Sequence, residues 1–215
     1  MQFSSTKLPG VILVEPKVFE DDRGFIFESY HKQRFAEQRL SLNFCQDNHS
    51  RSKKGALRGI HYQIRQAQGK LVRVVIGEIY DVAVDLRKSS PTFGQWMGMY
   101  LSAENKKQIY IPPGFGHGFY VVSDWAEVLY KATDYYAPQW ERTLLWNDPQ
   151  VNITWPLSPG EEPTLSPKDA AGLPLEDAEV YDYGAFQTSW KVPEKRVCGG
   201  VHPRTPVFPA FLQLK

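Results

Sequence analysis

The sequence has little cysteine, no long hydrophobic run and no internal repeat or low-complexity segment. Its two cysteines, Cys45 and Cys198, are too few for a disulfide-rich secreted scaffold. No stretch approaches the ~18 consecutive apolar residues that a membrane-spanning helix requires. The opening "MQFSSTKLPGVILVEPK" lacks the apolar core of a signal peptide, because its apolar run "VILV" is only four residues long and is followed by Glu15. We therefore expect a cytoplasmic protein with free thiols and no membrane association.

The sequence also lacks an excess of charge of either sign. Its 25 lysines and arginines balance 24 aspartates and glutamates, which leaves a net charge of +1. That balance argues against an extended nucleic-acid surface, so any anion site must be a local cluster. Hydrophobic residues make up 42% of the 215 residues, enough for a substantial core.

What is present is a succession of short strand patterns. The segment 70–87, "KLVRVVIGEIYDVAVDLR", is β-branched and apolar, and Gly77 and Glu78 are expected to form a hairpin turn within it. Alternation places Tyr80 and Val82 on one face of the strand and Ala83 on the other. Further strands are expected at 96–102, 107–113, 118–123 and 126–136. Turn residues every eight to twelve positions are typical of a sandwich or jelly roll.

Helical and irregular segments occupy the two ends of this strand pattern. Residues 29–41 have a thin apolar stripe that includes Phe35 and predict one short surface helix. Eleven of the 16 prolines lie at or after Pro138. We expect 137–175 to be irregular, with one or two short helical turns, packed over a barrel. The sequence thus predicts a domain at 1–175 and an extension of unknown role, an arm or a tail, at 176–215.

Two histidines in glycine-flanked strand patterns raise the question of a metal site. His61 lies in "LRGIHYQ" and His117 in "PPGFGHGFY". A metal-binding jelly roll of the cupin type commonly carries a second histidine two residues after the first and a glutamate soon afterwards. Here those positions offer Gln63, Gln68 and Lys70. Two imidazoles without a carboxylate make a poor ligand set, so we expect no metal.

The alternative is a histidine that acts as a general base. Imidazole has a pKa near 6.5, which suits proton abstraction at neutral pH. Such a base needs a carboxylate to orient it, an acid across the substrate and a cation near a developing oxyanion. Asp169 in "LSPKD", Tyr130 in "VLYK" and Lys70 could fill these roles. Each also has an ordinary structural explanation: Asp169 could be a helix N-cap, Tyr130 a packing residue and Lys70 a solvated turn residue.

Several motifs, read in order, resemble one known family. They include "FEDDRGFIFESY", "QDNHSRSKKGALRGIHYQ", "LSAENKKQIYIPPGFGHGFYVVSD", "AEVLYKATDYYAP" and "LSPKD". This succession is similar to the dTDP-4-dehydrorhamnose 3,5-epimerase family over residues 5–175. The resemblance implies an all-β, cupin-type jelly-roll barrel, a homodimer, no metal or other cofactor, and a dTDP-sugar substrate. It implies inversion of C3 and C5 of dTDP-4-dehydro-6-deoxy-D-glucose.

The resemblance also implies roles for individual residues. His61 would remove the proton next to the C4 ketone, Asp169 would orient it, Tyr130 would return a proton from the opposite face, and Lys70 would stabilise the enolate. The positions that match the family's substrate-binding residues are Arg23, Glu28, Gln46, Asn48, Arg58, His117, Tyr136, Glu141 and Lys168. Of these, Arg23 and Glu28 would reach in from the partner subunit, and Tyr136 would stack on thymine.

Strand geometry sets two conditions on this assignment. Strict alternation places Arg58 and His61 on opposite faces, so both can line one pocket only if Gly59 marks a bulge or Arg58 reaches around the rim. Six residues of strand separate Tyr130 from Tyr136 and span about 20 Å. A single sugar nucleotide can contact both only if the strand bends or ends before Tyr136.

Three other functions remain open from the sequence. A related enzyme could invert only one centre of a dTDP-4-keto-6-deoxy sugar in an antibiotic-type pathway. A non-catalytic sugar-nucleotide-binding cupin should lack the base or the acid, whereas this sequence has His61, Asp169 and Tyr130. A metal-dependent cupin oxygenase or isomerase would need a better ligand set.

Overall fold

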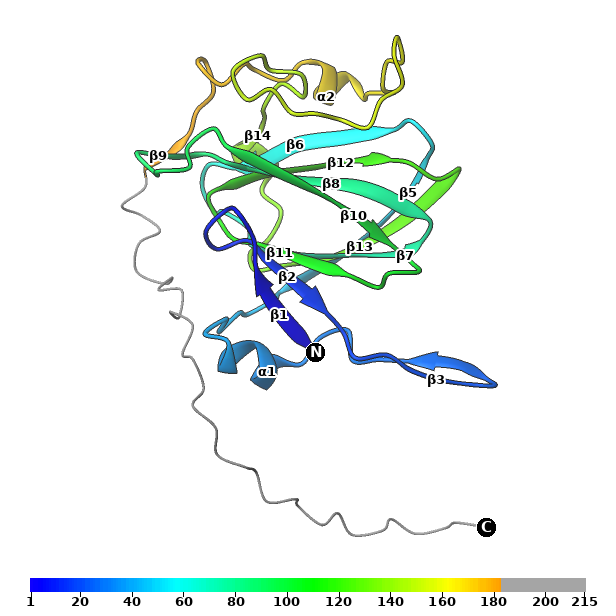
Figure 1. The fold of residues 1–215 in the computed structure, drawn as a ribbon. Coiled ribbons are helices and arrows are strands. Elements are labelled where there is room, and N and C mark those ends of the chain that lie inside the picture. The colour runs from blue at the N-terminus through cyan, green and yellow to red at the C-terminus, as the bar shows by residue number, and fades with distance from the viewer. Residues whose placement is uncertain (183–215) are drawn as a thin grey trace, which may run out of the picture.

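The structure, a computed structural model, describes residues 1–182 and consists mainly of antiparallel strands. Two sheets face each other and form a flattened jelly-roll barrel, as the sequence predicts (Figure 1). The six-stranded sheet has the order β1 (Gln2–Ser5), β2 (Ile12–Glu15), β11 (Gln108–Ile111), β7 (Lys70–Ile76), β13 (Trp125–Ala132), β5 (Gln46–Lys53). The five-stranded sheet has the order β10 (Trp96–Ser102), β8 (Glu78–Asp85), β12 (Phe115–Val121), β6 (Leu57–Gln63), β14 (Glu141–Thr143).

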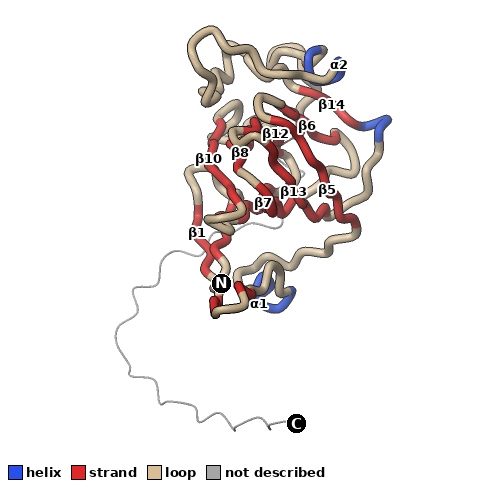
Figure 2. Tube along the Cα trace, turned by 90° about the vertical axis from the view of Figure 1, so that its right-hand side faces the viewer, coloured by secondary structure: helices blue, strands red, loops and turns tan. Residues whose placement is uncertain are grey.

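The remaining elements are short and lie around the barrel. Two small sheets pair β3 (Phe19–Asp21) with β4 (Gly24–Ile26), and β9 (Arg87–Lys88) with β15 (Tyr181–Asp182). The helical elements are α1 (Lys32–Glu37), the 3-10 turn η1 (Pro138–Trp140) and α2 (Pro167–Ala170). Figure 2 shows how little of the described chain is helical. Within residues 1–182 no helix has the length and apolar character needed to cross a membrane.

The core between the sheets follows from strand alternation. On β8, Ala83 and Ile79 face the interior and pack with Val72 and Val128 of the opposite sheet. Val82 belongs to a second cluster on the outer face of the five-stranded sheet. Burial of each large apolar side chain contributes about 1.5–3 kcal/mol, so both faces of this sheet stabilise the fold.

The second cluster is covered by the irregular segment that follows β14. Residues such as Val151, Ile153 and Trp155 are buried against the outer face of the five-stranded sheet. This loop layer lies above the barrel in Figure 1 and carries α2. The expectation of an irregular segment at 137–175 with short helical turns over the barrel is confirmed, except that β14 within it adds a strand to the five-stranded sheet.

The expected hairpin at Gly77 and Glu78 is wrong. β7 and β8 belong to different sheets, so the chain crosses from one sheet to the other at Gly77. Gly77 has φ +74°, and a side chain there would collide with the backbone of Trp125. Alternation alone cannot distinguish a hairpin from a sheet-to-sheet corner, because both keep the same face pattern.

The expected helix at 29–41 is present but shorter. α1 covers Lys32–Glu37, begins after His31, and is followed by Arg39 with a positive φ of 62°. Phe35 is fully buried and packs with Leu71 and Tyr110 of the six-stranded sheet. The helix is therefore an outer cover of that sheet, anchored by one aromatic side chain.

The first residues beyond 175 pack on the barrel. Tyr181 is 5% exposed, donates a hydrogen bond from its hydroxyl to the Gln63 carbonyl at 2.6 Å, and contacts the Tyr62 ring. Its backbone N–H donates to the Leu86 carbonyl at 3.0 Å. The rest of the predicted extension, including Cys198, lies outside the described residues.

Candidate active site

A cavity of about 320 Å³ opens between the two sheets and brings most of the predicted site residues together. The two sheets supply facing walls, with β6 and β12 on one side and β5, β7 and β13 on the other. The predicted residues that line it are Gln46, Asn48, Arg58, His61, Lys70, His117, Tyr130, Tyr136, Glu141 and Lys168.

His61 on β6 is hydrogen bonded to Asp169 of α2. The distance from His61 Nε2 to Asp169 Oδ1 is 2.5 Å. Since a carboxylate only accepts, Nε2 carries the proton and Nδ1 is the nitrogen free to act as a base. His61 Nδ1 has no hydrogen-bond partner among residues 1–182. Asp169 thus fixes both the orientation and the tautomer of His61.

Asp169 is held by the local structure of the "LSPKD" motif. Ser166 is the N-cap of α2 and accepts from the Asp169 N–H, while its hydroxyl donates to Asp169 Oδ2 at 2.7 Å. Burial alone would raise the pKa of Asp169, but hydrogen bonds from His61 and Ser166 outweigh it and hold that pKa at about 2. Burial lowers the pKa of His61, and the bond to Asp169 opposes this. A neutral imidazole beside a charged carboxylate is the form that a general base needs.

Gly59 allows Arg58 and His61 to line the same cavity. Gly59 has φ +126°, and the pairing of β6 with β12 shifts register between His117 and Phe119, opposite this glycine. Arg58 Nε donates to Ser52 Oγ at 2.8 Å, which holds its guanidinium at the rim. The predicted irregularity at Gly59 is confirmed.

Lys70 and Tyr130 come from the opposite sheet to His61. Lys70 opens β7, Tyr130 lies on β13, and the Lys70 Nζ is 5.9 Å from the centre of the Tyr130 ring. Burial lowers the pKa of Lys70 to about 8 and raises the pKa of Tyr130. The lysine therefore stays largely charged at neutral pH, and the tyrosine keeps its proton, as an acid must.

The far end of the cavity is a network of polar side chains around Tyr136. Its hydroxyl donates to Glu141 Oε2 at 2.8 Å, and its backbone N–H donates to Gln46 Oε1 at 2.9 Å. Glu141 also accepts from Lys168 Nζ at 2.8 Å, and Gln46 donates to Asn48 at 3.0 Å. β13 ends at Ala132, so the predicted end of the strand before Tyr136 is confirmed.

Arg23 and Glu28 are not brought to this cavity within the chain. Arg23 is exposed at the turn between β3 and β4 and pairs with Asp21, while Glu28 pairs with Arg34 at 2.7 Å. Figure 1 shows the β3 hairpin projecting from the barrel. The hairpin exposes Phe25 and Ile26, which are 59% and 73% accessible.

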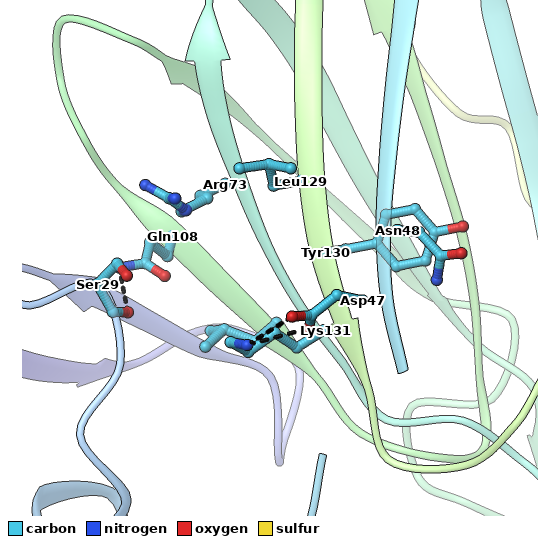
Figure 3. Close-up of a pocket in the computed structure, with 9 residues that line it drawn as sticks. Ser29, Asp47, Asn48, Arg73, Gln108, Leu129, Tyr130 and Lys131 are labelled. Carbon is cyan, nitrogen blue, oxygen red and sulfur yellow. Dashed lines mark hydrogen bonds and ion pairs between the residues drawn. The ribbon is translucent and has the colours of Figure 1, made fainter. Parts of the chain in front are cut away.

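A separate pocket lies on the outer face of the six-stranded sheet. Figure 3 shows Asp47 and Lys131 paired there, whereas Tyr130 and Asn48 point to the other side of their strands. Gln108 and Arg73 also line it. Because alternate residues of β5 and β13 serve the two faces, this pocket is distinct from the cavity that contains His61.

The contacts of two supporting residues were not predicted from the sequence. Ser166 could have been found, because Ser-Pro-x-Asp places a cap at the start of a helix and an acidic residue in its first turn. The alternative interpretation of Asp169 as the N-cap is wrong, because Ser166 is the N-cap and Asp169 lies in the first turn of α2. Asp81, whose Oδ2 accepts from His117 Nε2 at 2.8 Å, carries no local signal.

No group of three or more histidine, cysteine, aspartate or glutamate side chains in residues 1–182 could hold a metal ion. Gln63, at the position where a metal-binding cupin would place a ligand, is 4% exposed, and its side chain is hydrogen bonded to backbone groups. Its amide donates to the carbonyls of Gln66 and Tyr135 and accepts from the Ala137 N–H. Gln63 therefore positions the segment that carries Tyr136.

Comparison with known proteins gives consistent matches. A sequence model described as dTDP-4-dehydrorhamnose 3,5-epimerase matches residues 5–177. A Pseudomonas aeruginosa protein of that name is 58% identical over 182 residues, which cover 84% of this chain and 99% of the relative. A Legionella pneumophila 3,5-epimerase structure, in complex with dTDP-4-keto-L-rhamnose, is 50% identical with a TM-score of 0.81, and the match covers 85% and 98% of the two chains. A Streptomyces bikiniensis 3'-monoepimerase in complex with dTDP-quinovose is 34% identical with a TM-score of 0.79, and the match covers 85% and 94%.

Proposed function

Because the chain belongs to the dTDP-4-dehydrorhamnose 3,5-epimerase family, we propose that its central cavity binds a dTDP-linked 4-keto sugar and inverts it by proton transfer. The chain is an epimerase of that type, which acts on C3 and C5 of dTDP-4-dehydro-6-deoxy-D-glucose. The proposal concerns how its residues do so.

The observation that supports this mechanism is the placement of His61 and Tyr130 on facing sheets of one cavity. Inversion needs a base on one face of the sugar and an acid on the other. His61 Nδ1 removes the proton from the carbon next to the C4 ketone. Tyr130 returns a proton to the opposite face. C3 and C5 flank the same ketone, so one site serves both centres.

Lys70 stabilises the enolate that forms between the two proton transfers. Its ammonium lies in a buried setting, where an electrostatic interaction is stronger than in water. Asp169 keeps His61 in the required tautomer and stabilises the imidazolium that forms. These steps need only side chains, so the mechanism uses no metal or other cofactor.

The polar residues at the far end hold the nucleotide. The guanidinium of Arg58 suits forked hydrogen bonds to a diphosphate. Tyr136 stacks on thymine, which contributes about 1–3 kcal/mol on the scale of aromatic–base stacking. Gln46, Asn48, His117, Glu141 and Lys168 complete the binding site.

The site is completed by a second copy of the chain. The β3–β4 hairpin exposes apolar residues and carries Arg23 away from its own cavity. In a cytoplasmic homodimer the hairpin would place Arg23 and Glu28 at the partner's cavity. That arrangement would bury the exposed Phe25 and Ile26.

A coupled assay tests the function. The protein is incubated with the 4-dehydro sugar nucleotide, the downstream 4-keto reductase and NADPH, and NADPH oxidation is followed. Proton NMR in deuterated water then shows which carbons exchange. Exchange at both C3 and C5 supports the proposal, whereas exchange at one carbon would indicate a single-centre enzyme, as in the Streptomyces bikiniensis relative. Absence of any exchange would leave a non-catalytic binding protein.

A further inference from the structure

Asp81 is a fully buried acid that the mechanism above does not use. It lies on β8, is 0% exposed, and accepts from His117 Nε2 through Oδ2 at 2.8 Å. Its other oxygen, Oδ1, is buried and has no hydrogen-bond partner among residues 1–182. A buried carboxylate oxygen without a partner is costly, so its presence calls for a partner such as a water, an ion or a group that arrives during function.

Lys70 is the complementary group. Its ammonium lines the cavity and has no hydrogen bond or ion pair within residues 1–182. The negative charge of Asp81 is the largest of the influences that favour the protonated form of Lys70 against the effect of burial. The other titratable and charged groups that line the cavity with Lys70 are Arg58 and His61 on β6, His117 on β12, Tyr130 on the adjacent strand β13, Tyr136 beyond the end of that strand, Glu141 on β14 and Lys168 on α2.

We infer that Asp81 is a positioning residue of the epimerase site, with one oxygen holding His117 and the other holding Lys70 when the cavity is occupied. An ammonium has three N–H donors. One can reach the substrate's C4 oxygen while another reaches Asp81 Oδ1. Asp81 would then act through Lys70 and His117 without touching the sugar. This inference rests on the proposed role of Lys70.

The decisive measurement is a lysine-selective NMR titration of Lys70, assigned with Lys70→Arg. Wild-type protein, Asp81→Asn and Asp148→Asn are compared without substrate, so the result does not depend on activity. Asp148 is also buried, at 1% exposure, but it caps backbone N–H groups away from the cavity. Asp81→Asn should lower the Lys70 pKa by about 1 unit, and Asp148→Asn should leave it unchanged. An unchanged Lys70 pKa in folded Asp81→Asn, or an equal shift in the control, would overturn the inference.

Kinetics separate this inference from the proposed function. Since Lys70 must be protonated, the basic limb of kcat/KM should move to lower pH in Asp81→Asn, with a loss of about fivefold at pH 8 for a shift of 1 unit from a pKa near 8. A wild-type protein without epimerase activity refutes the function, and the titration still decides the role of Asp81.

If Asp81→Asn does not fold, hydrogen exchange of the Lys70 ammonium in the wild-type protein bound to dTDP decides. A Lys70 ammonium that exchanges slowly with water supports the contact, and one that exchanges rapidly rules it out.

Discussion

His61 and His117 lie directly opposite each other in the pairing of β6 with β12, yet their imidazoles have different surroundings. His61 binds Asp169 from the loop layer and has a side chain that is 23% exposed. His117 binds Asp81 from the neighbouring strand and is 7% exposed. Two adjacent histidines thus differ in exposure: the His61 side chain is partly open to the cavity, and the His117 side chain is buried against Asp81.

Replacing the base should stop the reaction. His61→Asn should lower kcat by about 10²–10⁴-fold and remove solvent exchange at C3 and C5, because an asparagine amide is not basic enough to take the proton. Proton NMR in deuterated water measures the exchange. Substantial exchange in a folded His61→Asn protein would move the base to another residue.

The Asp169→Asn change should reduce the activity less than His61→Asn does, and it should alter the dependence of kcat/KM on pH. Asp169 favours the protonated form of His61, so its loss lowers the His61 pKa further. Activity is lost at low pH as His61 becomes protonated, and this acidic limb should therefore move to lower pH while kcat falls. A limb that moves to higher pH would contradict the assignment. The measurement is kcat/KM between pH 4 and pH 8.

Removing only the acid should separate exchange from inversion. Tyr130→Phe keeps the ring, so the fold should hold. His61 should still remove and replace protons on its own face, which gives deuterium at C5 with retained configuration and little inverted product. Epimerisation at the wild-type rate by Tyr130→Phe would show that another group or a water is the acid.

Two inactive variants should complement each other if the site is shared between subunits. His61→Ala and Arg23→Ala proteins are mixed and allowed to exchange subunits, and activity should partly return because one site per heterodimer has both residues. A mixture of His61→Ala with His61→Asn is the control, since no site in that heterodimer has the base. Heterodimers that form without any recovery would indicate self-contained sites.

Chelation should leave the activity intact. Gln63 stands at the expected ligand position and is already committed to three backbone groups. Extended treatment with EDTA, followed by the coupled assay, should give the untreated rate. Loss of activity that a divalent ion restores would refute metal-independent catalysis.

Gly59→Ala should destabilise the barrel more than Gly24→Ala. The two glycines have nearly the same φ, +126° and +128°, but only at Gly59 would a Cβ crowd the backbone, at 2.5 Å from Gly118 Cα. Gly59→Ala should lower the free energy of unfolding by about 3 kcal/mol or more. Gly24→Ala should lower it only by the strain of the backbone conformation. Urea unfolding of both variants gives the comparison, and equal losses would show that crowding at Gly59 is unimportant.

Alternation and turn residues predicted the strands between residues 70 and 136 and a sandwich or jelly roll, but they did not predict β1, β2, β5 or β14. The cupin-type barrel was implied by the family resemblance. The conflict between Arg58 and His61 even located the irregularity at Gly59, because strand parity is a strict geometric rule. Parity could not show that Gly77 is a corner between sheets, since that depends on long-range pairing.

The candidate site was predicted through the motifs, and its supporting contacts were not. The pairing of Asp81 with His117 joins residues 36 positions apart, and no local pattern encodes it. The sequence pattern Ser-Pro-x-Asp is compatible with Ser166 as the N-cap, but only Asp169 was considered for that position. Contacts that connect distant strands depend on the register, which a single sequence does not reveal.

The docking of Tyr181 has a practical consequence for anyone who shortens this protein. A chain ended at residue 175, where the sequence pattern first suggests a boundary, would lose the hydroxyl that holds the Gln63 carbonyl and would leave the Tyr62 ring without its neighbour. Gln63 in turn fixes the backbone beside Tyr136. Such a shortened enzyme should bind its nucleotide more weakly even if it still folds. A shortened form of this protein should therefore keep Tyr181.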